Sequence, residues 1–248
     1  MNGQEEQTPH QPSTKEMILS GLQTKSAVKQ KVFDVTYDSL NLIREILHEL
    51  ELEVNSILQQ GDKRLQLESK DRGEFETEVK IAGDVLIFSM HSNIFVFDRD
   101  HSIWKNSYVQ KDKHNAYCGV INIYNFLADS FKYGRLEDLG YLVGRIFINQ
   151  EGHYFVEGKR QMGFLYNDFG NQIVSKEGLS KIVETAMLYA IEFDLLVPPY
   201  DAIKMATVGQ MNYKIDSARF QTGKRLGFKF NSDDVLDSKD TTKSNAKA

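Results

Sequence analysis

Cysteine is almost absent from this sequence: Cys118 is the one cysteine in 248 residues. An intramolecular disulfide is therefore excluded, and nothing indicates an oxidising compartment. The apolar neighbours of Cys118 predict that it is a small buried hydrophobe, with a nucleophilic thiol as the alternative.

Long apolar runs are lacking too. The most apolar stretch, residues 186–197, is interrupted by Glu192 and Asp194, and it is far shorter than the roughly 20 residues that a membrane-spanning helix needs. The N-terminal residues 1–6 have neither the basic nor the apolar region of a secretory signal. These absences predict a cytoplasmic protein with no membrane partner.

An excess of basic residues is the third absence. The chain has 30 Lys and Arg against 35 Asp and Glu, a formal net charge of -5. DNA-binding proteins usually need a surplus of cations, because their affinity comes largely from phosphate neutralisation. Net charge therefore does not favour a nucleic-acid partner, although a local basic patch stays open.

The familiar catalytic motifs are also missing: the chain has no HExxH, no GxGxxG after a strand and no GxSxG. His91, His101, His114 and Cys118 are spaced unlike any common set of metal ligands. Gly158-Lys159 follows Gly152 at the wrong distance for a phosphate-binding loop. We therefore predict no catalytic residue, no metal and no cofactor, and an enzyme with an unfamiliar site is only the second alternative.

What is present is an ordinary globular balance, with 41% hydrophobic and 26% charged residues. Residues 1–15 and 231–248 offer almost nothing that a core could bury, so we expect a disordered head and a disordered polar tail. Between them, residues 16–230 are expected to form a single domain, helical over 16–61 and built of a sheet plus helices over 74–230.

The clearest periodicity is a heptad pattern between residues 33 and 57, and it predicts a long amphipathic helix that ends near Gly61, with a shorter helix over 16–31 before it. One set of positions recurs every seven residues and a second set follows three positions later. The two sets are Phe33, Leu40, Leu47 and Val54, and Thr36, Ile43, Leu50 and Ile57.

Two interpretations of this helix stay open. Tyr37, Ile46 and Leu58 widen the apolar stripe, as expected for a helix that packs on a sheet of its own chain. Alternatively, the helix forms a coiled-coil homodimer, and the seam would then consist of Phe33, Leu40, Ile43, Leu47, Leu50, Val54 and Ile57.

From residue 74 the period changes to two, which predicts a strand with one buried face. Further strands are expected at 85–88 and 94–97, and their close spacing requires an antiparallel meander. Residues 120–127 are expected to run from a strand into a short helix, and 141–148 with 153–156 to form a hairpin.

A second long helix is predicted over 176–196, with Ser175 as its N-cap and Pro198-Pro199 ending it. Another helix over 200–213 and a terminal strand or hairpin over 219–230 would follow. The resulting class is α+β, an antiparallel sheet of five to seven strands with helices on one side.

Two segments resemble each other, because Gly158-Lys159-Arg160 and Gly223-Lys224-Arg225 are each followed by a glycine and an aromatic residue. Side by side, they would place cations next to aromatic rings, the combination that binds phosphates and stacks bases. The candidate ligand residues are Lys159, Arg160, Lys224, Arg225, Tyr154 and Phe228. Two solvated, glycine-containing turns are the simpler interpretation.

Two function hypotheses follow. The first is a non-enzymatic interaction or small-ligand-sensing module, dimeric through the 33–57 helix, with a protein or a small molecule as its partner. The second is a nucleic-acid or nucleotide-phosphate binding protein that uses the two Gly-Lys-Arg segments.

Overall fold

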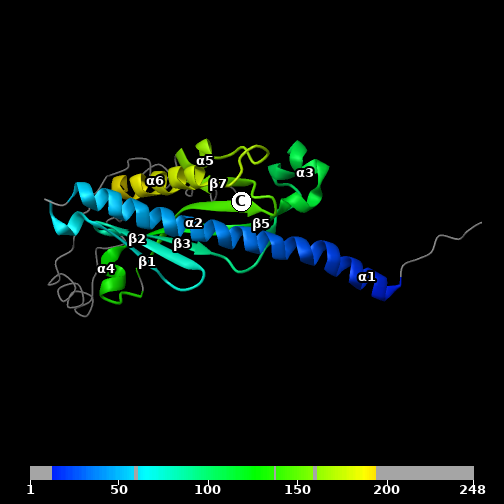
Figure 1. The fold of residues 1–248 in the computed structure, drawn as a ribbon, viewed down its shortest axis with the longest axis horizontal. Helices are drawn as coiled ribbons and strands as arrows, with labels where there is room; N and C mark the ends of the chain where they lie inside the picture. The colour runs from blue at the N-terminus through cyan, green and yellow to red at the C-terminus, as the bar shows by residue number, and fades with distance from the viewer. Residues whose placement is uncertain (1–12, 59–60, 137, 159–160, 194–248) are drawn as a thin grey trace, which may run out of the picture.

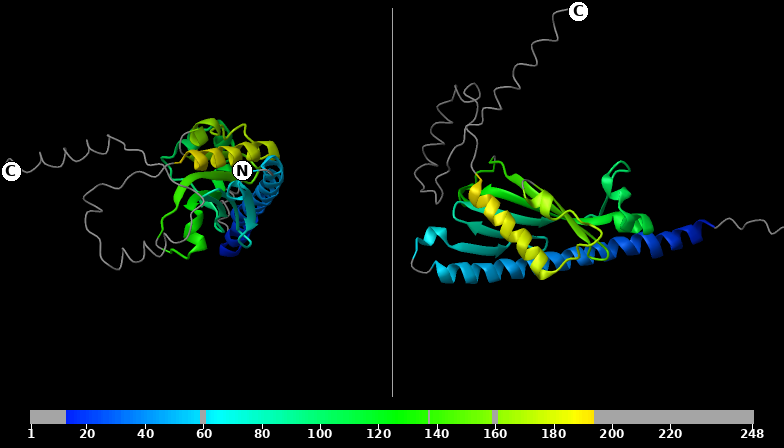
Figure 2. Two further views of the ribbon diagram at one scale, coloured as in Figure 1. Left: turned by 90° about the vertical axis from the view of Figure 1, so that its left-hand side faces the viewer. Right: turned by 90° about the horizontal axis from the view of Figure 1, so that it is seen from above.

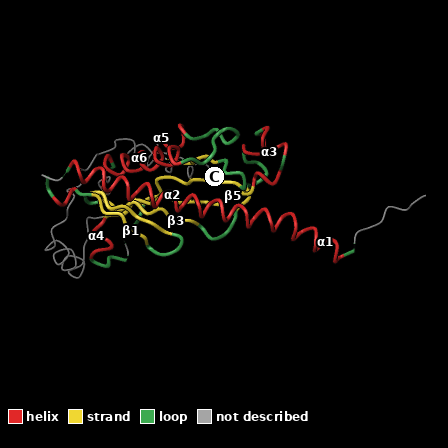
Figure 3. Tube along the Cα trace, in the orientation of Figure 1, coloured by secondary structure: helices red, strands yellow, loops and turns green. Residues whose placement is uncertain are grey.

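The computed structural model describes residues 13–58, 61–136, 138–158 and 161–193. A seven-stranded antiparallel sheet has two long helices on one face, which confirms the predicted α+β class. Figure 1 shows these helices, α2 (Ala27–Ile57) and α6 (Lys176–Glu192), on the same side of the sheet, with the short helix α4 (Ala128–Lys132) on the other side. The tube in Figure 3 shows the same layers by secondary structure.

The N-terminal helix is longer than predicted. Helix α1 (Thr14–Gly21) continues through a π-helical turn (Leu22–Ser26) into α2, so the expected separate helix over 16–31 is part of one long helix. Ser13 caps its start: its hydroxyl accepts from the backbone of Glu16, whose side chain accepts from the backbone of Ser13. Helix therefore already begins within the head expected to be disordered.

The sheet follows the chain almost without crossovers, in the order β1-β2-β3-β5-β6-β7, and β4 pairs with β5. This confirms the predicted antiparallel pairing. The strands are β1 (Leu67–Asp71), β2 (Glu76–Ile81), β3 (Asp84–Met90), β4 (Phe95–Val96), β5 (Tyr117–Leu127), β6 (Tyr141–Asn149) and β7 (Tyr154–Gly158). Strand β1 was not predicted, because its sequence LESKD has no apolar alternation.

The segment between β3 and β5 holds the short strand β4 and, after it, three short helical elements. It holds two 3-10 turns, Ser102–Lys105 and Lys113–Ala116, on either side of helix α3 (Ser107–Lys111). A third 3-10 turn, Lys63–Leu65, precedes β1, and helix α5 (Gln161–Leu165) follows β7. Buried side chains of the segment between β3 and β5, among them Ile103 and Val109, form a second small core with the sheet face opposite α2.

The main core lies between the sheet and the two long helices. Figure 2 shows the sheet and these helices from the end and from above. Because side chains alternate along a strand, every second residue of β3 and β5 points toward the helices. Phe88 and Ile123, paired across these strands, are fully buried there. From α6, Leu179, Ile182 and Val183 complete the same core.

The heptad residues pack within their own chain. Leu40, Ile43 and Leu47 have no exposed surface and lie in the main core, and Phe33, Leu50 and Val54 are partly buried against it. A dimer seam through the first three would require this core to open. Ile57, at the end of the helix, is 77% exposed.

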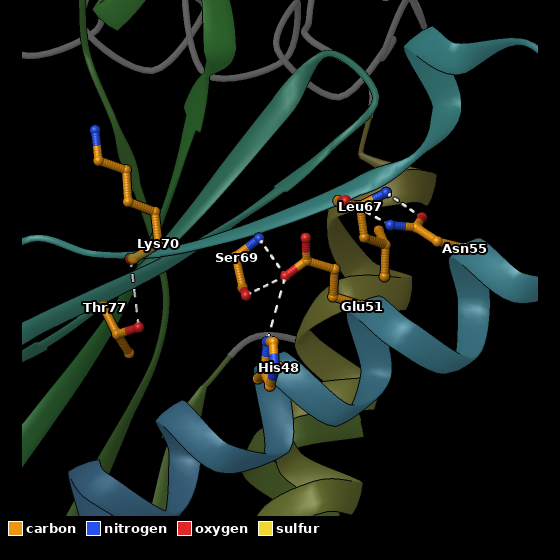
Figure 4. Close-up of polar contacts among 7 residues, drawn as sticks. All are labelled: His48, Glu51, Asn55, Leu67, Ser69, Lys70 and Thr77. Carbon is orange, nitrogen blue, oxygen red and sulfur yellow. Dashed lines mark hydrogen bonds and ion pairs between the residues drawn. The ribbon is translucent and has the colours of Figure 1, made fainter.

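Polar side chains of α2 protect the exposed edge of the sheet at β1. The Asn55 amide both donates to the backbone oxygen of Leu67 and accepts from its nitrogen, each at 2.9 Å. One turn earlier, the Glu51 carboxylate accepts from the backbone nitrogen and the hydroxyl of Ser69. Figure 4 shows both contacts. An unpaired strand edge invites association with other chains, and here the helix satisfies part of that edge.

Helix α6 is the second predicted helix, and Ser175 is its N-cap as predicted. The Ser175 hydroxyl accepts a hydrogen bond of 3.0 Å from the backbone nitrogen of Gly178. The helix ends at Glu192, four residues before the predicted end. The predicted hairpin is β6 with β7, and the predicted transition from strand to helix is β5 with α4. The elements expected over 200–213 and 219–230 lie outside the described residues.

Helix α2 approaches β5 closely at Gly119. A Cβ atom there would lie 2.1 Å from the Oγ1 atom of Thr36, a fully buried residue. We expect Gly119→Ala to lower the free energy of unfolding by about 1–3 kcal/mol, because the overlap must push the helix away from the sheet. Urea denaturation measures this change. Gly21→Ala is the control, since nothing lies within 4 Å of the added atom, and an unchanged stability of both variants would contradict the close approach.

The edge contact predicts that Asn55→Leu will lower stability by about 1–2 kcal/mol, because two backbone groups of Leu67 lose their partner. Hydrogen exchange of the Leu67 amide should become faster relative to the amide of Val79 in the neighbouring strand. Ser56→Ala is a matched control, as Ser56 donates only to Glu53 within the helix. If the Leu67 amide exchanges at the same rate in all three proteins, Asn55 does not protect the edge.

Candidate functional site

The face of the sheet opposite α2 and α6 carries a row of polar side chains, and this face is called the outer face below. The row crosses five strands through cross-strand pairs: Glu76, Ser89, Asn122, Arg145 and Glu157. At one end of the row, Ser89 donates a hydrogen bond of 2.9 Å to Glu76. At the other end, Arg145 and Glu157 form an ion pair of 2.7 Å.

Aromatic side chains lie beside this row, over β5, β6 and β7. The rings of Phe147 and Phe155 stack with their centres 4.9 Å apart, and Phe97 lies 5.1 Å from Phe147. On Phe97, the imidazole of His101 stacks at 4.5 Å. The segment between β3 and β5 thus supplies a wall, and the sheet supplies a floor.

Wall and floor enclose a cavity of about 530 Å³, called the aromatic groove. Six aromatic or aliphatic side chains line it together with six polar or ionisable ones: Phe95, Val96, Phe97, Val120, Tyr124 and Phe147, with His91, Asp98, His101, Asn122, Arg145 and Glu157. An adjoining hollow of about 480 Å³ shares Phe97, His101, Phe147 and Glu157 and extends to Phe164, which is 86% exposed.

Arg145 is the central charged group of the aromatic groove. Its guanidinium carbon lies 5.8 Å from the centre of the Phe147 ring, and Glu157 is the one acceptor that the described residues give it. Among those residues, no group accepts from its buried Nε atom. The Arg145 side chain is 41% exposed, and a guanidinium has five N–H groups, so the exposed part of the group has donors that a ligand can use.

The charges of Arg145 and Glu157 balance each other in an ion pair that lines the groove. Burial raises the pKa of the Cys118 thiol, which has no exposed surface and stays protonated; this confirms the interpretation as a buried hydrophobe. In the described part of the chain, no three His, Cys, Asp or Glu side chains are grouped so that they could hold a metal ion.

The ligand residues predicted from the sequence lie elsewhere. Tyr154 is 4% exposed in the main core, and its hydroxyl would lie 2.9 Å from a Cβ added to Gly178 of α6. Its ring is therefore not free to stack on a ligand. Lys159, Arg160, Lys224, Arg225 and Phe228 lie outside the described residues, so the Gly-Lys-Arg site stays a prediction.

The polar row was not predicted from the sequence, although two of its residues can be recognised there. Asn122 and Arg145 interrupt strands that are otherwise apolar, and a polar residue at an outward position marks the face that the helices leave uncovered. What the sequence does not reveal is the pairing of these positions, which depends on the register of β5 with β6.

Comparison with protein-family models, with curated proteins and with solved structures gave no match. Among the described helices, none is long and apolar enough to cross a membrane.

Proposed function

We propose that this chain is a non-enzymatic sensing or interaction module that binds a small ligand in the aromatic groove. The observation that carries this proposal is the groove itself. Pockets for small ligands are typically about 300–1,000 Å³, mostly apolar, with a few polar groups that fix orientation. The aromatic groove has that size, and its lining combines six aromatic or aliphatic side chains with six polar or ionisable ones.

The lining also suggests the kind of ligand. Phe95 is 40% exposed and Phe97 and Tyr124 are partly exposed, so a flat, largely apolar molecule suits this aromatic lining. Asn122 and Arg145 lie opposite each other on β5 and β6 and supply hydrogen-bond donors. Glu157 balances the charge of Arg145, which favours a ligand with an uncharged acceptor, such as a carbonyl oxygen, over a strong anion.

A second copy of this chain is the partner that we propose for the projecting end of the N-terminal helix. Met17, Ile18, Leu19 and Leu22 are each more than half exposed, and α1 extends past the sheet in Figure 1. Leu19 and Leu22 lie two heptads before Phe33 and Thr36 in the sequence, and the π-helical turn Leu22–Ser26 shifts the helical phase between the two pairs. An exposed apolar stripe of this kind suits helix pairing.

The cytoplasm is the compartment that we propose. Its reducing conditions keep thiols free, and Cys118 is an unpaired thiol.

The aromatic groove is tested by native mass spectrometry of protein purified gently from its own cells. We expect a small-molecule mass on the wild type that is absent from Asn122→Trp, because the indole would fill the groove. Lys181→Trp, with the same new side chain on the exposed face of α6, should retain the mass. A mass retained by all three proteins would place the ligand elsewhere, and a bare chain in all three would contradict the proposal.

The dimer is tested by light scattering after size exclusion. The wild type should have twice the 28.4 kDa mass of the chain, and Ile18→Asp with Leu22→Asp should give single chains, because charges would enter the apolar stripe. Ser20→Asp with Thr24→Asp adds the same charge on the opposite side of the helix and should remain dimeric. A monomeric wild type, or a dimer in all three, would contradict the pairing.

A further inference from the structure

A second cavity on the outer face has a different character. It has a volume of about 660 Å³ and lies over β1, β2 and the start of β3, with α4 as its wall. Five cationic side chains line it: Arg64, Lys70, Arg72, Lys80 and Lys132. This concentration is notable because the chain as a whole has a net charge of -5. We call this cavity the basic groove.

Two of the cations are already paired on the floor of the basic groove. Arg72 forms an ion pair with Glu78, and Lys80 forms one with Glu68, its direct neighbour across the two strands. These four side chains balance one another and fix the floor, so they contribute polarity but no net charge.

Arg64 is paired as well, at the rim. Its guanidinium donates to both carboxylate oxygens of Asp62, and this contact lowers the pKa of Asp62 to about 2. Asp62 therefore stays ionised at neutral pH and cancels the charge of Arg64.

Lys70 and Lys132 are the cations left over. In the described part of the chain, neither forms an ion pair with a carboxylate within 4.0 Å. Asp129 is the one remaining acidic side chain of the lining, so the groove holds one more positive charge than negative. Figure 4 shows Lys70 pointing away from α2, whereas its neighbour Ser69 points toward Glu51.

The two lysines come from different elements that line the same groove, Lys70 from β1 and Lys132 from α4. Phe131 of the same helix is 40% exposed, and the Arg72 guanidinium carbon lies 4.2 Å from the centre of its ring. Phe131 thus adds an aromatic surface to the lining, and the Lys132 ammonium group lies 5.1 Å from the centre of the neighbouring Tyr133 ring. Low-dielectric walls strengthen the field that such charges produce.

We propose that the basic groove binds a phosphate group of a small molecule between Lys70 and Lys132. An ammonium group donates up to three hydrogen bonds and acts as a point charge toward phosphate. The volume admits a phosphate ester with a ring-sized organic part, which can lie against Phe131. This site differs from the Gly-Lys-Arg segments in residues, and from the aromatic groove in both charge and position.

The test is calorimetric titration of the full chain with inorganic pyrophosphate at low ionic strength. We expect saturable one-to-one binding, weakened about tenfold by Lys70→Gln and about tenfold by Lys132→Gln, since each removes one charge-assisted contact. Both lysines are exposed, so the variants should keep the thermal midpoint of the wild type. Binding should weaken as salt is added.

Lys181→Gln on α6 removes the same charge far from the groove and should bind pyrophosphate as the wild type does. Three outcomes would overturn the proposal: no binding to the wild type at millimolar pyrophosphate, affinities unchanged by Lys70→Gln and Lys132→Gln, or an equal loss in Lys181→Gln, which would indicate a general charge effect. None of these outcomes bears on the aromatic groove, whose lining shares no residue with the basic groove.

Discussion

The packing of α2 across one face of the sheet is the interaction on which the rest of the structure depends. The helix lies against β5 at Gly119 and reaches the edge strand β1 through Glu51 and Asn55. Helix α6 fills the remaining space on the same face. One face of the sheet is thereby committed to the core, and grooves are left to the other face.

On the outer face, alternation along each strand turns every second residue toward the grooves. The polar row from Glu76 to Glu157 is the direct result, because cross-strand pairing aligns outward positions of five strands. The aromatic groove lies at the β7 side of this face and the basic groove at the β1 side. Two ligand chemistries can therefore be separated on one sheet, with the rigid core beneath both.

The sequence revealed what depends on local periodicity. Heptad spacing predicted α2, the alternation after residue 74 predicted β2, and Ser175 marked the start of α6. It did not reveal β1, whose residues Leu67 and Ser69 are held by side chains of a helix that precedes them in the chain. Nor did it reveal the grooves, because Arg145 meets Glu157, and Lys70 shares a cavity with Lys132, only after strands and helices have paired. The heptads themselves were ambiguous, since a helix on a sheet and a helix in a dimer bury similar stripes.

Thiol labelling of neighbouring residues on β5 shows whether α2 and α6 bury one face of the sheet and leave the other open. Ile121 is fully buried beneath the helices, Asn122 lines the aromatic groove, and the native Cys118 is fully buried as background. We expect Asn122→Cys to react rapidly in the folded protein and Ile121→Cys to react only as fast as the chain unfolds. Equal rates for the two variants, whether fast or slow, would contradict this arrangement.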